Sequence, residues 1–132
     1  MNVIHGRVKR INSSNGLSEV EVQTNIGNIY SVVLEAPQEA EFMQEGRAVE
    51  CIIKETSVVL LKEETPCINT FKGVVRSVER GSVLSFIRVE CENLELKAVL
   101  LTRQVDTLDL SESHLIYVFL PPMQVALEVL RE

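Results

Sequence analysis

Hydrophobic and polar residues alternate with a period of two along much of this chain, and this pattern predicts β-strands. In residues 18–24, Val20 and Val22 share one face while polar residues occupy the other. Residues 86–91 repeat the pattern in the second half of the chain. A strand with one face on a hydrophobic core and one face in water has this alternation. We therefore expect a mainly β protein.

The remaining elements follow from turn residues and apolar runs. An Asn- and Gly-rich segment at 25–28 predicts a hairpin turn, as do residues 92–93, because these residue types tolerate tight turns. Pro37 predicts a helix start, since proline is harmless at the first helical position. Charged residues before Pro66 predict a solvated linker over residues 62–70. The other expected segments are strands at 29–34, 48–53, 57–61, 94–101, 115–120 and 124–129 and short helices at 36–43 and 104–110.

The chain also repeats itself. When it is shifted by 67 positions, residues 6–61 align with residues 73–128 without a gap, with about 10 identities over about 56 positions. A constant offset over this span indicates a duplicated domain of about 60 residues. A unit of that size buries too little surface to be stable alone, so the halves should pack together or form an oligomer. The order β-β-β-α-β-β in each repeat predicts two tandem OB-like five-stranded barrels, each with one short helix, over residues 1–64 and 65–132.

Composition limits the choice of partner. The net charge of −6 and the pI of about 5.0 argue against nucleic acid, which needs a basic surface. Four Phe, two Tyr and no Trp also leave few side chains for base stacking. A small anion held at one local site is compatible with an acidic chain, because backbone amides can supply the local field.

The cysteines and histidines give no sign of metal binding or catalysis. Cys51, Cys67 and Cys91 are odd in number and lack CxxC spacing, so we interpret them as buried small hydrophobes. His5 and His114 do not correspond across the repeat, and we expect both at the surface. The sequence has no nucleophile elbow, phosphate-binding glycine loop or zinc-protease motif. We therefore expect a protein that is not an enzyme and has no metal and no covalent cofactor.

The start of the chain is too polar for a signal peptide, and no apolar run approaches the ~20 residues of a membrane span. These features predict a cytoplasmic protein without membrane insertion.

One polar segment interrupts two strongly apolar strands. Lys54, Thr56 and Ser57 lie between residues 49–53 and 58–61. They form either a polar turn or an anion site, since a lysine gives a charged donor and the hydroxyls add further donors beside backbone amides.

Residues 49–61, VECIIKETSVVLL, resemble the closing motif of the Mop/TOBE domain, a hydrophobic strand followed by I-K-A-T-S-V-x-L. The glycine-valine starts at Gly6 and Gly73 and the helix followed by Gly46 also resemble that family. The resemblance covers both repeats, as in the tandem molbindins. It implies an OB-like barrel that binds molybdate or tungstate noncovalently, between subunits of a homo-oligomer. The implied role of such a protein is storage, homeostasis or transport regulation of the anion, with a transporter or regulatory partner.

The family's site also uses an S-A-R-N segment ahead of the glycine. Asn2 and Asn69 match its Asn, while Pro66 and Ile68 stand at its Ser and Arg positions in the second repeat. In the repeat alignment, Pro121 replaces Lys54 and Gln124 replaces Ser57. Neither half therefore holds a complete site. The alternative is a degenerate TOBE-type interaction module that no longer binds an anion. The predicted oxyanion-binding residues are Lys54, Thr56, Ser57, Asn2 and Asn69.

Overall fold

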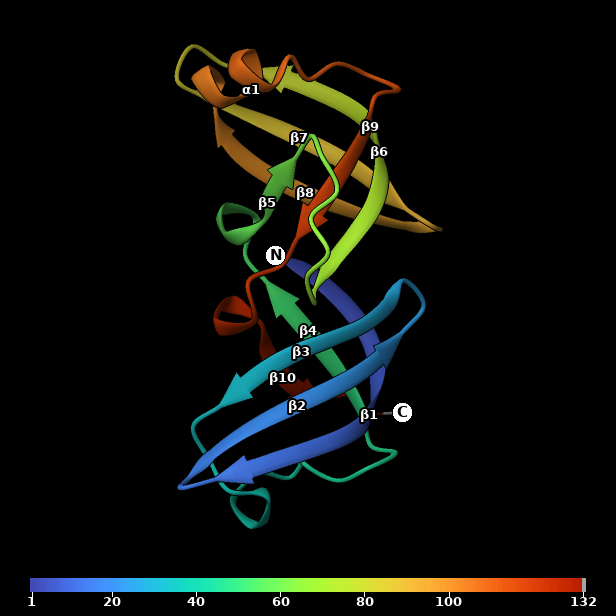
Figure 1. The fold of residues 1–132 in the computed structure, drawn as a ribbon, viewed down its shortest axis with the longest axis vertical. Helices are drawn as coiled ribbons and strands as arrows, with labels where there is room; N and C mark the ends of the chain where they lie inside the picture. The colour runs from blue at the N-terminus through green and yellow to red at the C-terminus, as the bar shows by residue number, and fades with distance from the viewer. Residues whose placement is uncertain (132) are drawn as a thin grey trace.

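The computed structural model describes residues 1–131 as two curled five-stranded sheets stacked along the long axis of the molecule (Figure 1). This confirms the predicted mainly β architecture. Four strands of each sheet come from one repeat, in the order fourth, first, second, third. In the first sheet they are β1 (Asn2–Ser14), β2 (Leu17–Thr24), β3 (Gly27–Val33) and β4 (Ala48–Ile53). In the second they are β6 (Thr70–Arg80), β7 (Leu84–Cys91), β8 (Leu94–Leu101) and β9 (Leu115–Phe119).

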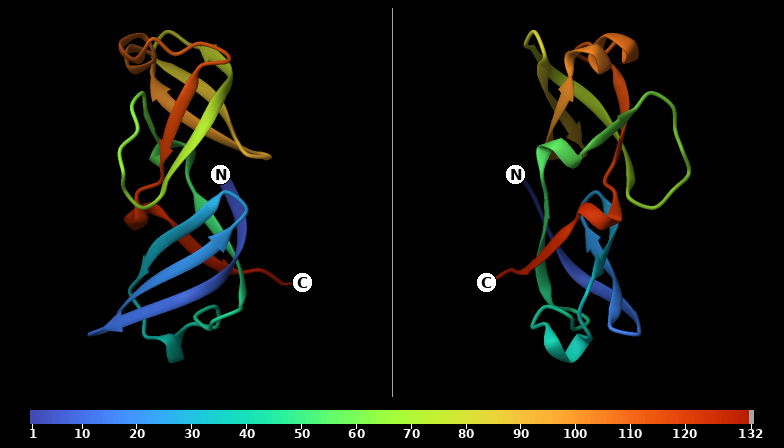
Figure 2. Two further views of the ribbon diagram at one scale, coloured as in Figure 1. Left: turned by 45° about the vertical axis from the view of Figure 1, so that its right-hand side comes forward. Right: turned by 90° about the vertical axis from the view of Figure 1, so that its left-hand side faces the viewer.

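The fifth strand of each sheet comes from the other repeat. Strand β5 (Val59–Leu61) pairs antiparallel with β9, and β10 (Ala126–Val129) pairs antiparallel with β4. Two connections therefore cross between the barrels, and Figures 1 and 2 show them running in opposite directions through the middle of the molecule. The sequence duplication divides near residues 64 and 65, but the sheets do not follow that division. Each repeat supplies the strand that completes the other sheet.

Repeated local features explain several identities between the halves. A side chain at Gly6 would lie about 2.6 Å from the carbonyl oxygen of Gln23, and one at Gly73 about 2.9 Å from that of Glu90. Both glycines are needed because the first strand of each repeat passes tightly over the second. The register shifts a few residues later in both strands, between Val8 and Arg10 and between Val75 and Ser77. Such bulges increase the local bend that lets a sheet curl.

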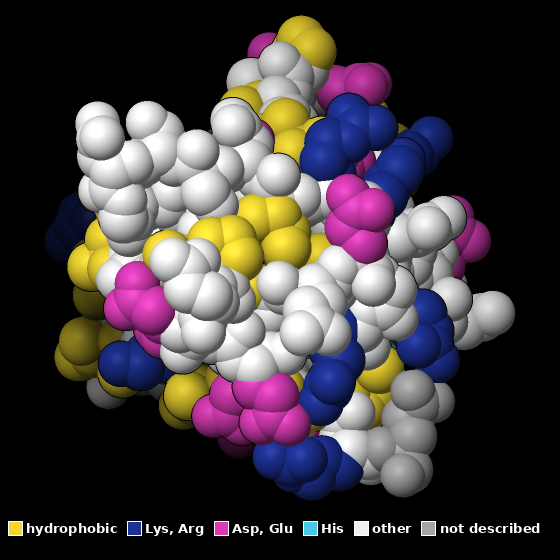
Figure 3. All heavy atoms as spheres, turned by 90° about the horizontal axis from the view of Figure 1, so that it is seen from below, with side chains coloured by type: hydrophobic (Ala, Val, Ile, Leu, Met, Phe, Trp, Pro, Cys, Tyr) yellow, Lys and Arg dark blue, Asp and Glu magenta, His cyan; other side chains and the backbone are white. Residues whose placement is uncertain are grey.

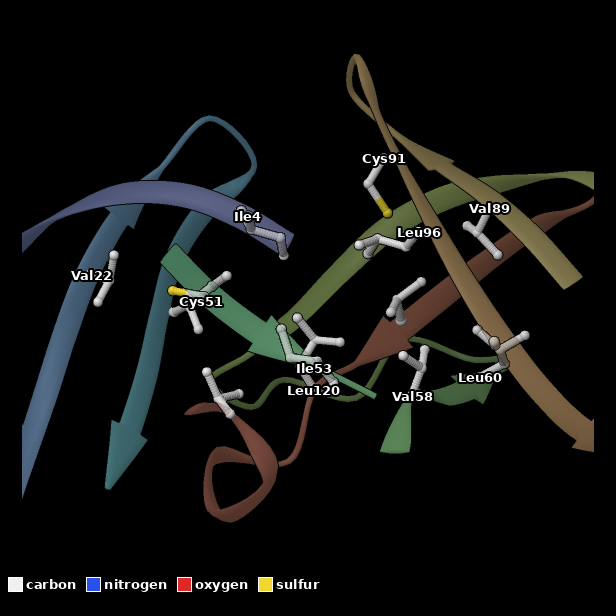
Figure 4. Packing of buried hydrophobic residues seen from close by; sticks show 14 of the residues in the cluster. Ile4, Val22, Cys51, Ile53, Val58, Leu60, Val89, Cys91, Leu96 and Leu120 are labelled. Atoms are coloured by element: carbon white, nitrogen blue, oxygen red, sulfur yellow. The ribbon is translucent and has the colours of Figure 1, made fainter. Parts of the chain in front are cut away.

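The hydrophobic core runs through both barrels and the junction between them. Ile53, the last residue of β4, and Leu120, the residue after β9, are fully buried and lie close together in Figure 4. Val58, which follows the first crossing connection, is 3% exposed and belongs to the same cluster. The two barrels therefore share one core.

The two expected helices differ in the structure. The second is confirmed as α1 (Thr102–Leu108), whose start is fixed by a hydrogen bond from the Leu101 N–H to Gln104 Oε1, 2.9 Å. At the first, only a 3-10 turn forms, η1 (Pro37–Glu39), and the chain becomes extended at Ala40. Ala40 and Met43 are buried there, so tertiary packing overrides the helix propensity of the segment.

The structure also tests the cysteine prediction. Cys51 and Cys91 are buried, and burial raises their pKa to about 12 and about 11, so both thiols stay protonated at neutral pH. Cys67 is exposed in the linker, so the prediction of a buried hydrophobe is wrong for this residue. Within residues 1–131, no helix is long and apolar enough to cross a bilayer.

Candidate functional site

Two short turns carry the crossing connections and meet at the junction of the barrels. The Lys54 turn, residues 54–57, contains η2 (Glu55–Ser57), and the Pro121 turn, residues 121–124, contains η3 (Pro122–Gln124). They occupy equivalent positions in the two repeats. Their backbones match as well, because Ser57 N–H donates to the Lys54 carbonyl at 2.9 Å and Gln124 N–H to the Pro121 carbonyl at 2.8 Å. The turns touch where the Ser57 hydroxyl donates to Gln124 Oε1 at 3.3 Å.

The Lys54 turn presents three donors toward water. Lys54 and Thr56 are exposed, Ser57 is half-buried, and the buried Val58 anchors the turn from below. Among residues 1–131, no carboxylate lies within ion-pair distance of the Lys54 ammonium. The ammonium and the two hydroxyls can therefore reorient toward a ligand at little cost, since only the Ser57 hydroxyl has a partner to give up.

Asn2 lies beside this turn, but its side-chain amide is hydrogen-bonded to the main chain of the other barrel. Its Nδ2 donates to the Lys97 carbonyl and its Oδ1 accepts from the Lys97 N–H, both at 2.8 Å. The side chain is held firmly in place because Asn2 is 5% exposed and pairs with Ile53 at the end of β4. Asn2 thus joins β1 of the first barrel to the open edge of β8 in the second.

Asn69 makes the equivalent contact in the opposite direction. It receives the Tyr30 N–H at 2.7 Å and donates to the carbonyls of Tyr30 and Leu120 at 2.9 and 2.8 Å. Both amide hydrogens are then used, so in this conformation Asn69 has none left to donate to an anion. Its backbone has a φ of 61°, a left-handed conformation that asparagine tolerates well.

A carboxylate also lies in the Lys54 turn. Glu55 accepts from the Met1 ammonium at 2.7 Å, and this hydrogen bond holds the pKa of Glu55 below its ordinary value. Lys97 is close enough to lower that pKa further. Glu55 stands where the Mop/TOBE motif has alanine. Its charge opposes an anion, although the Met1 ammonium offsets part of it.

An open hollow of about 440 Å³ lies against this region on the outer side of β7 and β8. Its polar lining consists of Glu55, Glu79, Lys97, Arg88 and Ser77. Packing of β8 against η2 brings the two repeats together here. At the corresponding place of the Pro121 turn, Tyr30 stands at the position of Lys97 and Pro121 at the position of Lys54, and the carboxylates of Glu21 and Glu19 lie near Tyr30.

Other basic residues gather at the far end of the first barrel. Arg47 and Arg131 both bind the Glu41 carboxylate, at 2.9 and 3.2 Å. Figure 3 shows this end of the molecule, with basic and acidic side chains interspersed around a small hydrophobic area. Arg47 and Arg131 are both engaged by Glu41, whereas the Lys54 ammonium has no carboxylate partner among residues 1–131, so the Lys54 turn remains the better candidate.

The structure therefore groups Lys54, Thr56, Ser57 and Asn2 at one turn and places Asn69 at the other. Sequence reasoning missed Glu55 and Lys97. Glu55 was visible in the motif as a departure from alanine, but its pairing with Met1 was not. Lys97 lies near the turn only because the repeats exchange strands and Asn2 binds its main chain. The alternating pattern of β8 does not indicate either of these contacts. Within residues 1–131, no group of three or more His, Cys, Asp or Glu side chains could hold a metal ion.

The fold and the junction define a class of protein: a tandem pair of OB-like barrels that exchange their closing strands. Among solved structures, the chain is similar to ModG, a cytoplasmic molybdate-binding protein whose PEG-grown crystal form contains bound molybdate. The sequences are 21% identical over 97% of this chain and 95% of that chain, with a TM-score of 0.88. This likeness establishes the fold. No protein-family model and no curated protein matches the sequence.

Proposed function

We propose that this protein binds a tetrahedral oxyanion such as molybdate, noncovalently, at the Lys54 turn. The observation that carries the proposal is the exposed Lys54 ammonium, free of any carboxylate partner among residues 1–131, on a turn that is anchored by the shared core. A fold shared with a molybdate-binding protein supports it.

The chemistry of the turn suits this ligand. A tetrahedral oxyanion presents four acceptor oxygens and needs converging donors. Lys54 supplies a charged donor, and Thr56 and Ser57 supply hydroxyls. Hydrogen bonds from a charged donor are stronger than those between neutral groups. The Ser57 hydroxyl is held only by a 3.3 Å bond to Gln124, so a ligand can displace that contact.

We also propose the wider role that the sequence suggested. Tungstate, which has the same charge and shape, would bind at the same turn. Storage, homeostasis or regulation of transport of the anion in the cytoplasm fits a small binding protein. A homo-oligomer would cover the exposed side of the turn and remove water from the ligand.

Two observations favour the alternative of an interaction module without an anion. Glu55 places a negative charge within the turn, and the second turn has lost both its lysine and its serine. In that case the barrels would serve to contact a protein partner.

Thermal unfolding in the presence of molybdate, tungstate and sulfate separates these functions. A ligand at 100 times its Kd stabilises the folded state by about 2.7 kcal/mol, which shifts the Tm by several degrees. We expect molybdate to raise the Tm of the wild type and of Lys72→Ala, an exposed lysine on β6, but not of Lys54→Ala. If none of the three anions moves the wild-type transition, the binding function is wrong and the interaction module is favoured.

A further inference from the structure

We propose that Lys97 supplies the second positive charge of the oxyanion site and that Asn2 is a positioning residue which fixes Lys97 there. The inference rests on the proposed function of the Lys54 turn. It makes the site composite, with the turn from the first repeat and the second cation from β8 of the second repeat.

The first argument is the placement of the Lys97 backbone. The Asn2 side chain binds both the N–H and the carbonyl of Lys97 at 2.8 Å. The main chain at Lys97 therefore cannot shift without breaking two partly buried hydrogen bonds. Asn2 itself pairs with Ile53, the residue directly before Lys54. A single asparagine therefore sets the spacing between the two lysines.

The second argument is electrostatic. The Lys97 ammonium has no carboxylate within ion-pair distance in residues 1–131, although its charge reaches Glu55. Both residues line the 440 Å³ hollow, together with Arg88 and Ser77. Arg88 donates to the Ser77 hydroxyl at 2.8 Å, and its nearest carboxylate, Glu95, is 4.0 Å away. The Glu79 carboxylate also lines the hollow, so the two cations of this wall face two carboxylates, of which Glu55 is already bound by the Met1 ammonium.

The third argument is the contrast with the other turn. Asn69 holds Tyr30 by the same two main-chain bonds that Asn2 makes to Lys97. Both halves therefore contain an asparagine clamp, the pair of hydrogen bonds from one asparagine side chain to the main chain of the other barrel. It positions a cation only beside the turn that carries a lysine.

Molybdate affinity of charge variants tests this inference. We expect Lys97→Gln to weaken binding about fivefold to tenfold, because it removes one full charge from a solvent-exposed wall. Lys97→Arg should retain most of the affinity, and Lys72→Gln should bind like the wild type. The weakening should shrink as salt is raised, which a purely structural effect would not show.

The role of Asn2 is tested by a double-mutant cycle. Asn2→Ala should weaken binding, but adding it to Lys97→Gln should weaken binding little further, since both act through the same charge. Full additivity of the two changes would overturn the positioning role, and the lysine variants carry the test if Asn2→Ala does not fold. If Lys97→Gln binds like the wild type while Lys54→Ala does not bind, the inference fails and the proposed function stands. If the wild type binds no oxyanion, the function itself fails.

Discussion

The Lys54 and Pro121 turns share a backbone and differ in chemistry. Each is a 3-10 turn closed by the same main-chain hydrogen bond, and each leads into a strand that completes the opposite barrel. The buried positions after the turns carry identical residues in the two repeats. In the repeat alignment, Val58 matches Val125 and Leu60 matches Leu127. The exposed positions have diverged. Packing therefore preserved the frame of both turns, while only the Lys54 turn carries the lysine and the two hydroxyls that we propose to hold an anion.

The largest effect should come from breaking the clamps that the two halves share. Asn69→Ala removes three hydrogen bonds at a 2% exposed position and leaves Tyr30 and Leu120 groups unpaired, so we expect a loss of about 3 kcal/mol in unfolding free energy. Asn2→Ala removes two such bonds and should cost about 2 kcal/mol. Urea unfolding of both variants measures the difference. Equal losses below about 0.5 kcal/mol would show that the clamps do not hold the barrels together.

The next largest effect concerns the ligand. Lys54→Ala should weaken molybdate binding by about 100-fold or more, the upper range for a hydrogen bond to a charged group, so that binding is no longer detected at ligand concentrations that suffice for the wild type. Pro121→Ala changes the equivalent position of the other turn and should leave the affinity unchanged. Isothermal titration of the two variants checks the contrast. A similar loss in both would mean that the two turns contribute equally.

Glu55 offers a change in the opposite direction. Glu55→Gln removes the negative charge from the Lys54 turn, and we expect molybdate affinity to rise about threefold to tenfold at low salt. Glu50→Gln, on β4, serves as a control for the change in net charge. Weaker binding by the Glu55 variant would indicate that the Met1–Glu55 pair is needed to shape the site.

Acid should remove the contribution of the Met1–Glu55 pair. The pKa of Glu55 is lowered in the folded state, so its stabilising effect is fully present above the ordinary pKa and is lost as the pH falls through the lowered one. The wild type should therefore be slightly more stable than Glu55→Gln at pH 7, and the two should converge in the acidic range below about pH 4.5. Tm measurements across this range, in the absence of ligand, test the prediction. A difference that stays constant would show that the carboxylate charge contributes nothing.

The contact between the turns should matter least. Ser57→Ala removes a 3.3 Å hydrogen bond at a partly exposed site, and Gln124→Ala removes its other partner. Each should change the unfolding free energy by less than about 0.5 kcal/mol. Only Ser57→Ala should also weaken molybdate binding. A comparable loss of affinity in Gln124→Ala would place the ligand between the turns.

Local sequence patterns located every strand except β1 and β6, because a strand that buries one face shows a period-two alternation. The Lys54 turn was visible for the same reason, as a polar break between apolar strands. The exchange of β5 and β10 could not be predicted, because their apolar positions fit either barrel equally well. The helix expected near Pro37 failed because Ala40 and Met43 are needed in the core.

Site residues that depend on long-range contacts were beyond the reach of sequence patterns. Asn2 and Asn69 were named as oxyanion-binding residues, but nothing local in the sequence indicates that their amides bind the main chain of the other barrel. Lys97 lies 43 positions from Lys54 in the sequence, and only the exchanged fold brings its strand to the turn.

Equilibrium dialysis with molybdate tests the central claim that one of the two turns is a binding site. The wild type should bind no more than one molybdate per chain, Pro121→Ala should bind the same amount, and Lys54→Ala should bind none at the same concentration. Two molybdates per wild-type chain, or undiminished binding by Lys54→Ala, would contradict the account.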